Sequence, residues 1–156
     1  MYIRAKTYLE EIRSTRRAID NKVKELKEYD FMLEASGITY DNLNVTVSPR
    51  QDGLEKKAIA HIERCAELRA DIAEMIEWMH KRIDEAVNYI NQIESKEQQE
   101  VLILRYINCY NWAEIADIRD RSEESQQRLA GRGRKSLQAI LDREGEGVSE
   151  SESSEK

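Results

Sequence analysis

The sequence predicts an all-α protein in which two long helices precede several shorter ones. The chain of 156 residues has one proline and six glycines, a scarcity that favours long helices over sheets and tight turns. Apolar residues recur at alternating steps of three and four over residues 3–35 and 54–93, the spacing of an apolar seam along a helix. We therefore expect an N-terminal antiparallel coiled-coil hairpin of residues 1–95, followed by a helical domain of residues 96–143.

The first long helix is predicted over residues 3–35, and Ser36 and Gly37 favour its end because glycine readily adopts the left-handed conformation that closes a helix. Its seam combines one series at seven-residue spacing with two companion positions: Ala5, Ile12, Ile19, Leu26 and Leu33, with Leu9 and Val23. Residues 36–53, which include the only proline, Pro49, are predicted to form the hairpin loop. A short extended piece at residues 44–47 is an alternative within that loop.

The second long helix, residues 54–93, carries the strongest periodicity of the chain. Two interleaved series, interrupted only by Arg69, are typical of a coiled-coil seam. They are Ala58, Cys65, Ile72, Met79, Ala86 and Ile93, and Ile62, Ile76, Ile83 and Ile90. This segment is longer than the first, so part of its seam is expected to pack elsewhere. The C-terminal domain and a second copy of the chain, in a homodimer, are both open as partners.

Three shorter helices are predicted after residue 95, over residues 96–107, 112–118 and 122 to about 141. Asn111 and Ser122 are the expected N-caps, since their side-chain oxygens can accept hydrogen bonds from free amides of the first turn. Gly131 and Gly133 each cost about 1 kcal/mol relative to alanine inside a helix. We therefore expect the second half of the last helix to fray or kink.

Charge is unevenly distributed along this acidic chain, whose net charge is -6. Residues 125–143 have five basic residues and one acidic residue, a balance of +4, whereas residues 144–156 have five glutamates and one lysine, a balance of -4. A local basic patch can still attract an anionic partner. The last segment has one valine among glycine, serine and glutamate, so residues 144–156 are predicted to be a disordered acidic tail.

The C-terminal segments contain a motif that resembles the region-four helix-turn-helix of sigma factors. It consists of Leu104-Arg105-Tyr106, Trp112-Ala113-Glu114-Ile115-Ala116, Ser122, Gly131-Arg132 and Lys135-Ser136-Leu137. Over residues 1–141 the chain is similar to a family of small phage and prophage proteins, the sigma-factor-like late-gene transcription regulators. The resemblance implies a transcription regulator that binds double-stranded DNA through this helix-turn-helix, with RNA polymerase as a candidate second partner.

Six residues of the last helix are the candidate DNA contacts, because a helix-turn-helix places its second helix in the major groove. Those expected to face the bases are Ser125, Gln127 and Arg128, and those expected to contact phosphates are Arg132, Arg134 and Lys135. The chain departs from the family at Arg119, Gln126 and Arg134, where apolar residues are usual. Each departure costs about 1–3 kcal/mol if the side chain is buried, and we expect weakened or partner-dependent DNA binding.

A second function of a different class stays open beside DNA binding. Under this second function, the chain is a protein-interaction adaptor that binds its partners through the coiled coil. The helix-turn-helix then docks a protein partner without reading bases. An enzyme is not expected, since no nucleophile–base pair, phosphate-binding glycine loop or metal-ligand cluster stands out. We likewise expect no cofactor, no metal, no membrane partner and a cytoplasmic location. Cys65 and Cys109 fit no metal or disulfide spacing and are expected to be free thiols.

Overall fold

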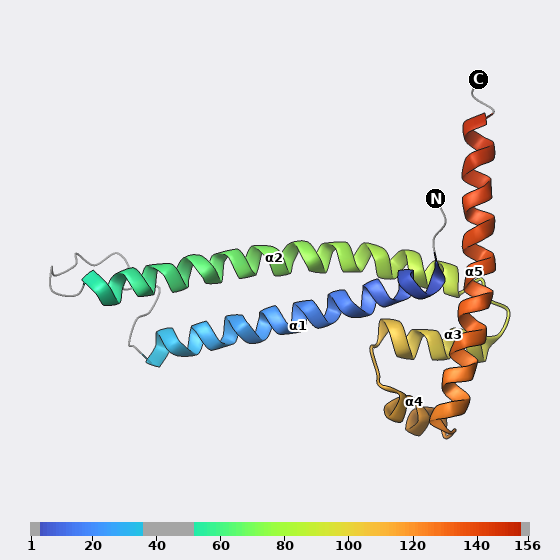
Figure 1. Ribbon diagram of the computed structural model, residues 1–156, viewed down its shortest axis with the longest axis horizontal. Coiled ribbons are helices and arrows are strands. Elements are labelled where there is room, and N and C mark those ends of the chain that lie inside the picture. The colour runs from blue at the N-terminus through green and yellow to red at the C-terminus, as the bar shows by residue number, and fades with distance from the viewer. Residues whose placement is uncertain (1–3, 36–51, 154–156) are drawn as a thin grey trace. The chain divides into compact units, whose positions relative to one another are not determined.

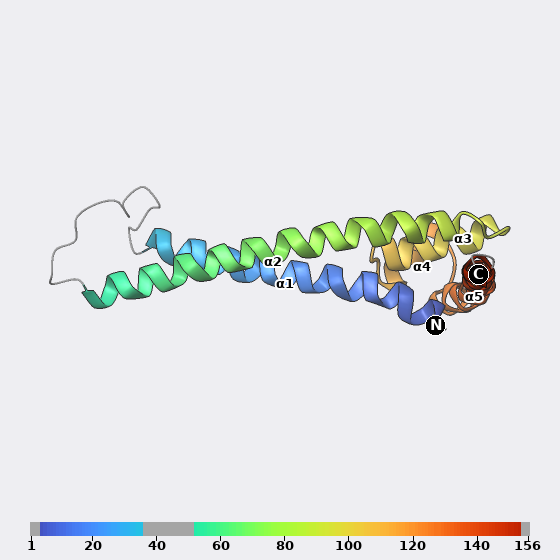
Figure 2. The same ribbon diagram turned by 90° about the horizontal axis from the view of Figure 1, so that it is seen from above.

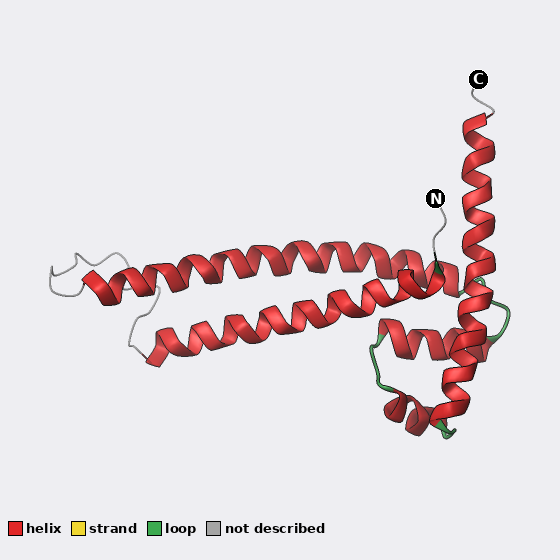
Figure 3. Cartoon of the chain, in the orientation of Figure 1, coloured by secondary structure: helices red, strands yellow, loops and turns green. Residues whose placement is uncertain are grey.

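The structure, a computed structural model, describes residues 4–35 and 52–153, with residues 52–55 and 146–153 as backbone alone. These residues form helices and connecting turns without any strand (Figure 3), so the predicted all-α class is confirmed. The elements in order are α1 (Ala5–Ala35), α2 (Asp52–Ile90), α3 (Lys96–Leu102), the π-helical turn η3 (Ile103–Ile107), α4 (Trp112–Arg119) and α5 (Glu123–Ser153) (Figure 1). The alternative extended piece at 44–47, and the predicted loop up to residue 51, lie outside the described residues.

The chain divides into two compact units. Unit 1 combines residues 1–15 with residues 79–156, and unit 2 comprises residues 16–78. Each long helix therefore contributes to both units. In the described residues, no helix combines the length and apolar character that crossing a membrane requires.

Unit 2 consists of the segments of α1 and α2 that run side by side in opposite directions (Figures 1 and 2). Its buried cluster draws on the heptad series of both helices. The members are Leu33, Ala58 and Cys65, with Leu26, Tyr29 and Ile62 partly buried against them. Cys65 is fully buried and is a free thiol, because no disulfide partner is close to it among the described residues.

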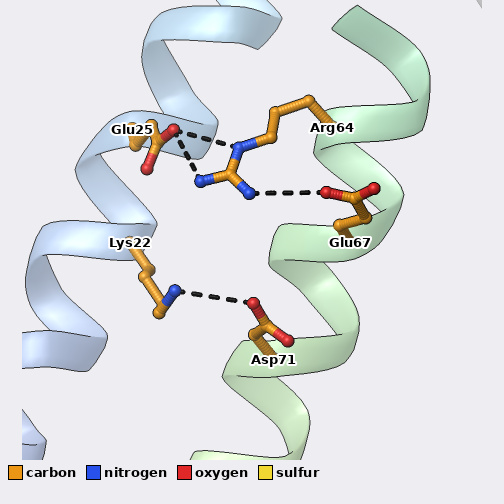
Figure 4. A network of polar contacts seen from close by, with 5 residues as sticks. All are labelled: Lys22, Glu25, Arg64, Glu67 and Asp71. Atoms are coloured by element: carbon orange, nitrogen blue, oxygen red, sulfur yellow. Dashed lines mark hydrogen bonds and ion pairs between the residues drawn. The ribbon is translucent and has the colours of Figure 1, made fainter. Parts of the chain in front are cut away.

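Ion pairs connect the two helices of unit 2 along one side (Figure 4). The Arg64 Nη2 atom lies 3.1 Å from Glu25 Oε1, and its Nη1 atom lies 3.4 Å from Glu67 Oε2. The Lys22 Nζ atom lies 3.5 Å from Asp71 Oδ2. The hydrogen bonds that Arg64 donates to the Glu25 carboxylate raise the pKa of Arg64. Water and salt screen such exposed pairs, so they contribute little, and apolar burial rather than charge holds this unit together.

Unit 1 has a single apolar core that draws on almost every helix of the chain. Its buried members are Ala5, Tyr8, Leu9, Ile12, Ala86, Ile90, Ile93, Val101, Leu102, Tyr106, Ile115, Leu129, Ala130, Leu137, Ile140 and Leu141. The start of α1 and the end of α2 are therefore packed in the same core as α3, α4 and α5. This core crosses residue 95, the position of the predicted domain boundary.

Tyr8 links the start of α1 to the end of α2 within unit 1. Its ring is 3% exposed and meets the Tyr89 ring edge-on, with 6.2 Å between ring centroids. The Arg82 guanidinium lies 5.2 Å from the centroid of the Tyr8 ring. Burial, and secondarily the negative charge of Glu85, raises the pKa of Tyr8 above its ordinary value. Tyr8 is thus a neutral core residue that contributes chiefly through its packed ring.

Helix α5 is longer and more regular than the sequence predicts. It continues through Gly131 and Gly133 and ends at Ser153, whereas composition predicted fraying after the glycines and disorder from residue 144. A Cβ atom on Gly133 would lie 3.1 Å from Leu102 Cγ, so this glycine admits the close approach of α3 to α5. Elongating an existing helix is also much easier than nucleating one, which accounts for helix in a segment of unfavourable composition.

Replacing Gly131 by alanine is expected to stabilise unit 1 by about 1 kcal/mol, the difference in helix propensity between these residues. The added Cβ would meet only the Arg134 Nη2 atom, at 3.7 Å, an ordinary contact. Chemical denaturation of the full chain measures the effect. Gly133→Ala is the matched comparison and should give no such gain, because its Cβ would press on the buried Leu102. Equal gains from both variants would contradict this packing.

Candidate nucleic-acid interface

Helix α4 begins at a capping box that holds its first turn. The Glu114 N–H donates to Asn111 Oδ1 at 2.8 Å, and the Asn111 N–H donates to Glu114 Oε2 at 2.9 Å. The predicted Asn111 cap is confirmed. The reciprocal role of Glu114 was missed, although an acidic residue three positions after an N-cap is its sequence signature.

The turn between α4 and α5 comprises residues 120–122. Asp120 adopts the left-handed conformation, with φ of 51°, and the Arg121 N–H donates to the Ala116 carbonyl at 3.1 Å. The Ser125 N–H donates to Ser122 Oγ at 3.2 Å, so the predicted Ser122 cap is confirmed. The reversal is short because Asp120 ends one helix and Ser122 starts the next.

The segment before α4 is held by an arginine stacked on a tryptophan. The Arg105 guanidinium lies 4.5 Å from the centroid of the Trp112 ring, and its Nη1 atom donates to the Tyr110 carbonyl at 3.2 Å. These contacts fasten η3 to the start of α4. Both residues belong to the motif found in the sequence, and the stacking assigns them a structural role.

Three basic residues follow one exposed face of α5. Arg128, Arg132 and Lys135 are separated by steps of four and three, which places their side chains on the same side of a helix. All three are exposed, and Gln127 is exposed beside them. We call Arg128, Arg132 and Lys135 the basic stripe. Four of the six candidate DNA contacts are therefore solvent-accessible, and three of these carry a positive charge.

The other two candidates are engaged within the protein. The Ser125 hydroxyl donates to the Ser122 carbonyl at 2.8 Å, as part of the cap of α5. The half-buried Arg134 donates from Nη1 to the Tyr106 hydroxyl at 3.1 Å, and Tyr106 is 2% exposed. Arg134 thus ties α5 to η3, and its charge is directed away from the basic stripe.

The polar residues at expected apolar positions have different surroundings. Arg119 has a side chain only 10% exposed and forms an ion pair with Glu100 on α3, which compensates its charge. Gln126 is 3% exposed, and its Oε1 atom has no hydrogen-bond partner among the described residues. Its Nε2 atom donates weakly to Ser125 Oγ at 3.3 Å. Arg119 Nε likewise has no hydrogen-bond partner among the described residues, but only Gln126 lacks an ion pair to offset the cost of burying a polar side chain.

Carboxylates surround the start of α5. The exposed acidic residues between the first turn of α4 and the first turn of α5 are Glu114, Asp117, Asp120, Glu123 and Glu124. Glu124 also forms an ion pair with Arg128 one turn later. Arg128 is therefore already paired with a carboxylate, whereas Arg132 and Lys135 lie further along α5 from this acidic segment.

The described residues offer no metal site, since no three histidine, cysteine, aspartate or glutamate side chains come together among them. Comparison of the chain with protein-family models, with curated proteins and with solved structures gave no match. The functional assignment therefore depends on the geometry of α4 and α5.

Proposed function

We propose that the chain is a non-enzymatic transcription regulator that binds double-stranded DNA. In this proposal α1 and α2 form an antiparallel coiled-coil hairpin, and α4 and α5 form a helix-turn-helix of the sigma-factor region-four kind. Helix α5 is the recognition helix. The single observation that carries the proposal is the basic stripe, three cations exposed on one face of the second helix of a tightly turned helix pair.

The positive charges of the basic stripe are complementary to the negatively charged phosphate backbone of a duplex. Arg132 and Lys135 are exposed and lie further along α5 than the carboxylates around the turn. Their side chains are therefore suited to contact phosphates. Gln127 and Arg128 lie nearer the start of α5, where a recognition helix meets base edges. Arginine can pair with guanine and glutamine with adenine through two hydrogen bonds. In this proposal, affinity for DNA comes mainly from the phosphate contacts, and selectivity for base sequence comes from Gln127 and Arg128.

Arg132→Ala and Lys135→Ala are each expected to weaken binding to a mixed-sequence duplex. Each lost phosphate contact should make the slope of log K against log salt concentration about 0.9 less negative. Fluorescence anisotropy with the full chain at several salt concentrations measures both quantities. Lys27→Ala is the matched control, because it removes the same charge from an exposed position outside α4 and α5. Equal effects from Lys27→Ala and Lys135→Ala would contradict a local interface.

The adaptor function is the second candidate, and the carboxylates around the start of α5 favour it. Five exposed acidic residues there repel phosphates and attract a basic protein surface. Ile118, 52% exposed, lies among them. In this alternative RNA polymerase is the proposed partner, and the helix pair docks it without reading bases. Asp117→Lys distinguishes the two functions, because it should strengthen DNA binding under the first and weaken polymerase binding under the second.

A further inference from the structure

The start of α1 is fastened to α5 by a hydrogen bond between distant parts of the sequence. The Ala5 N–H donates to Gln138 Oε1 at 2.7 Å, and Ala5 is 2% exposed. Both residues belong to unit 1, and the start of α1 lies beside α5 in two perpendicular views (Figures 1 and 2). The first residues of α1 therefore have a defined position on the flank of α5.

Two exposed cations flank this anchored amide. Arg4 precedes Ala5 and Lys6 follows it, and both side chains are exposed. Consecutive Cα atoms are about 3.8 Å apart, so each cationic side chain starts close to the hydrogen bond with Gln138. On α5, Lys135 precedes Gln138 by three residues, which makes the two side chains neighbours on the helix surface. Arg4 and Lys6 thus adjoin the C-terminal end of the basic stripe.

Negative charge lies near the start of α1 as well, because the Glu85 carboxylate acts on Tyr8 one turn along α1. The first turn of α1 contains no acidic residue. Asp142, one turn beyond Gln138 on α5, accepts a hydrogen bond from Gln138 Nε2 at 3.0 Å. Gln138 thereby bridges Asp142 and the start of α1. Charges within about 8–10 Å of each other act together on an approaching anion at moderate salt. Arg4 and Lys6 adjoin the amide that Gln138 holds, and Lys135 lies one turn from Gln138 on α5, so the three side chains start from the same neighbourhood.

We propose that Arg4 and Lys6 contact the DNA phosphate backbone together with the basic stripe. The nucleic-acid surface then extends from α5 onto the start of α1, more than a hundred residues away in sequence. Gln138 is the positioning residue that holds this second element in place. The inference rests on the proposed DNA binding, and it adds phosphate contacts that lie outside the helix-turn-helix.

The test measures duplex binding by the full chain at several salt concentrations. Arg4→Ala and Lys6→Ala are each expected to make the slope of log K against log salt concentration about 0.9 less negative, and the double variant about twice that, with weaker binding at low salt. Lys27→Ala should change the slope less than either. An unchanged slope in the double variant, with Arg132→Ala weakening binding as expected, would overturn this inference alone. Absence of duplex binding by the unaltered chain would overturn the proposed function as well.

Gln138→Ala tests the positioning role without changing the net charge. It removes the acceptor for the Ala5 amide. The slope of log K against log salt concentration should therefore become less negative, although every cation remains. In the Arg4→Ala/Lys6→Ala background the same substitution should have no further effect, and thermal denaturation reports the fold of each variant. An equal loss of slope in both backgrounds would overturn the positioning role, as would no change in the otherwise unaltered chain.

Discussion

A fragment of residues 96–156 is expected to be largely unfolded, although it contains the whole helix pair α4–α5. Seven of the sixteen buried residues of the unit 1 core precede residue 96, among them Tyr8, Leu9, Ile12 and Ile90. Fully burying a large apolar side chain contributes about 1.5–3 kcal/mol. Losing several of them removes free energy comparable to the entire stability of a small domain, about 5–15 kcal/mol.

Far-UV circular dichroism and thermal denaturation of the fragment measure this directly. The expected result is low helix content without a cooperative transition. A single substitution in the full chain tests the same core more mildly. Leu9→Ala should lower the free energy of unfolding by about 2–5 kcal/mol, since Leu9 is fully buried. Ile118→Ala is the matched control and should cost little, because Ile118 is 52% exposed. A fragment that melts cooperatively at the temperature of the full chain would refute the shared core.

The shared core also affects how function is tested. Removing residues 1–95 does not cleanly separate the proposed hairpin from the proposed helix-turn-helix, because it takes away core residues that pack against α3, α4 and α5. Loss of DNA binding in such a fragment would report unfolding rather than a missing contact. Point substitutions at exposed residues of the full chain, such as Arg132→Ala, avoid this ambiguity.

Replacing Gln126 by leucine is expected to stabilise the chain by about 1–3 kcal/mol. Gln126 is 3% exposed, and its buried Oε1 atom lacks a hydrogen-bond partner among the described residues. An apolar side chain of similar size removes that desolvation cost. Within the described part of the chain, the side-chain hydrogen bond given up is the weak one from Nε2 to Ser125 Oγ, at 3.3 Å.

Urea denaturation of the full chain compares this variant with Gln127→Leu. Gln127 is exposed, so the second substitution should leave the free energy of unfolding almost unchanged. The pair matches residue type, helix and chemical change, and differs only in burial. A destabilised Gln126→Leu variant would show that the Gln126 amide makes compensating interactions, and the proposed packing of α5 would then be wrong.

Much of the secondary structure follows from local sequence patterns. The helical segments and both N-caps were predictable because periodicity and capping depend on neighbouring residues, and the structure confirms Asn111 and Ser122. The shared core was predictable in part: the surplus seam of the second helix was expected to pack elsewhere, with the C-terminal domain as one of two candidates, and Ala86, Ile90 and Ile93 do pack in that core. Periodicity identifies which face of α1 is apolar, but the seam through Leu9 and Ile12 does not reveal that part of it packs in a core with α5. The length of α5 was missed because composition describes an isolated segment and not one continuing an existing helix.

In the candidate interface too, features set by neighbouring residues could be predicted from the sequence, and features set by tertiary contacts could not. The basic stripe could be predicted, since three residues at helical spacing share a face wherever the helix lies. Arg134 was grouped with them by sequence proximity alone. Two residues beyond Arg132, it points to another side of α5 and reaches the Tyr106 hydroxyl. The proposed contribution of Arg4 depends on the hydrogen bond between Ala5 and Gln138, a tertiary contact that no local motif signals.

The most direct test of the central claim is the salt dependence of duplex binding by the full chain. The stripe predicts measurable affinity at low salt and a plot of log K against log salt with a slope of about -3, or steeper with Arg4 and Lys6 engaged. Replacing Arg128, Arg132 and Lys135 together by alanine should flatten that slope by nearly three. Binding that is absent at low salt, or that keeps its slope in the triple variant, would contradict DNA recognition through α5.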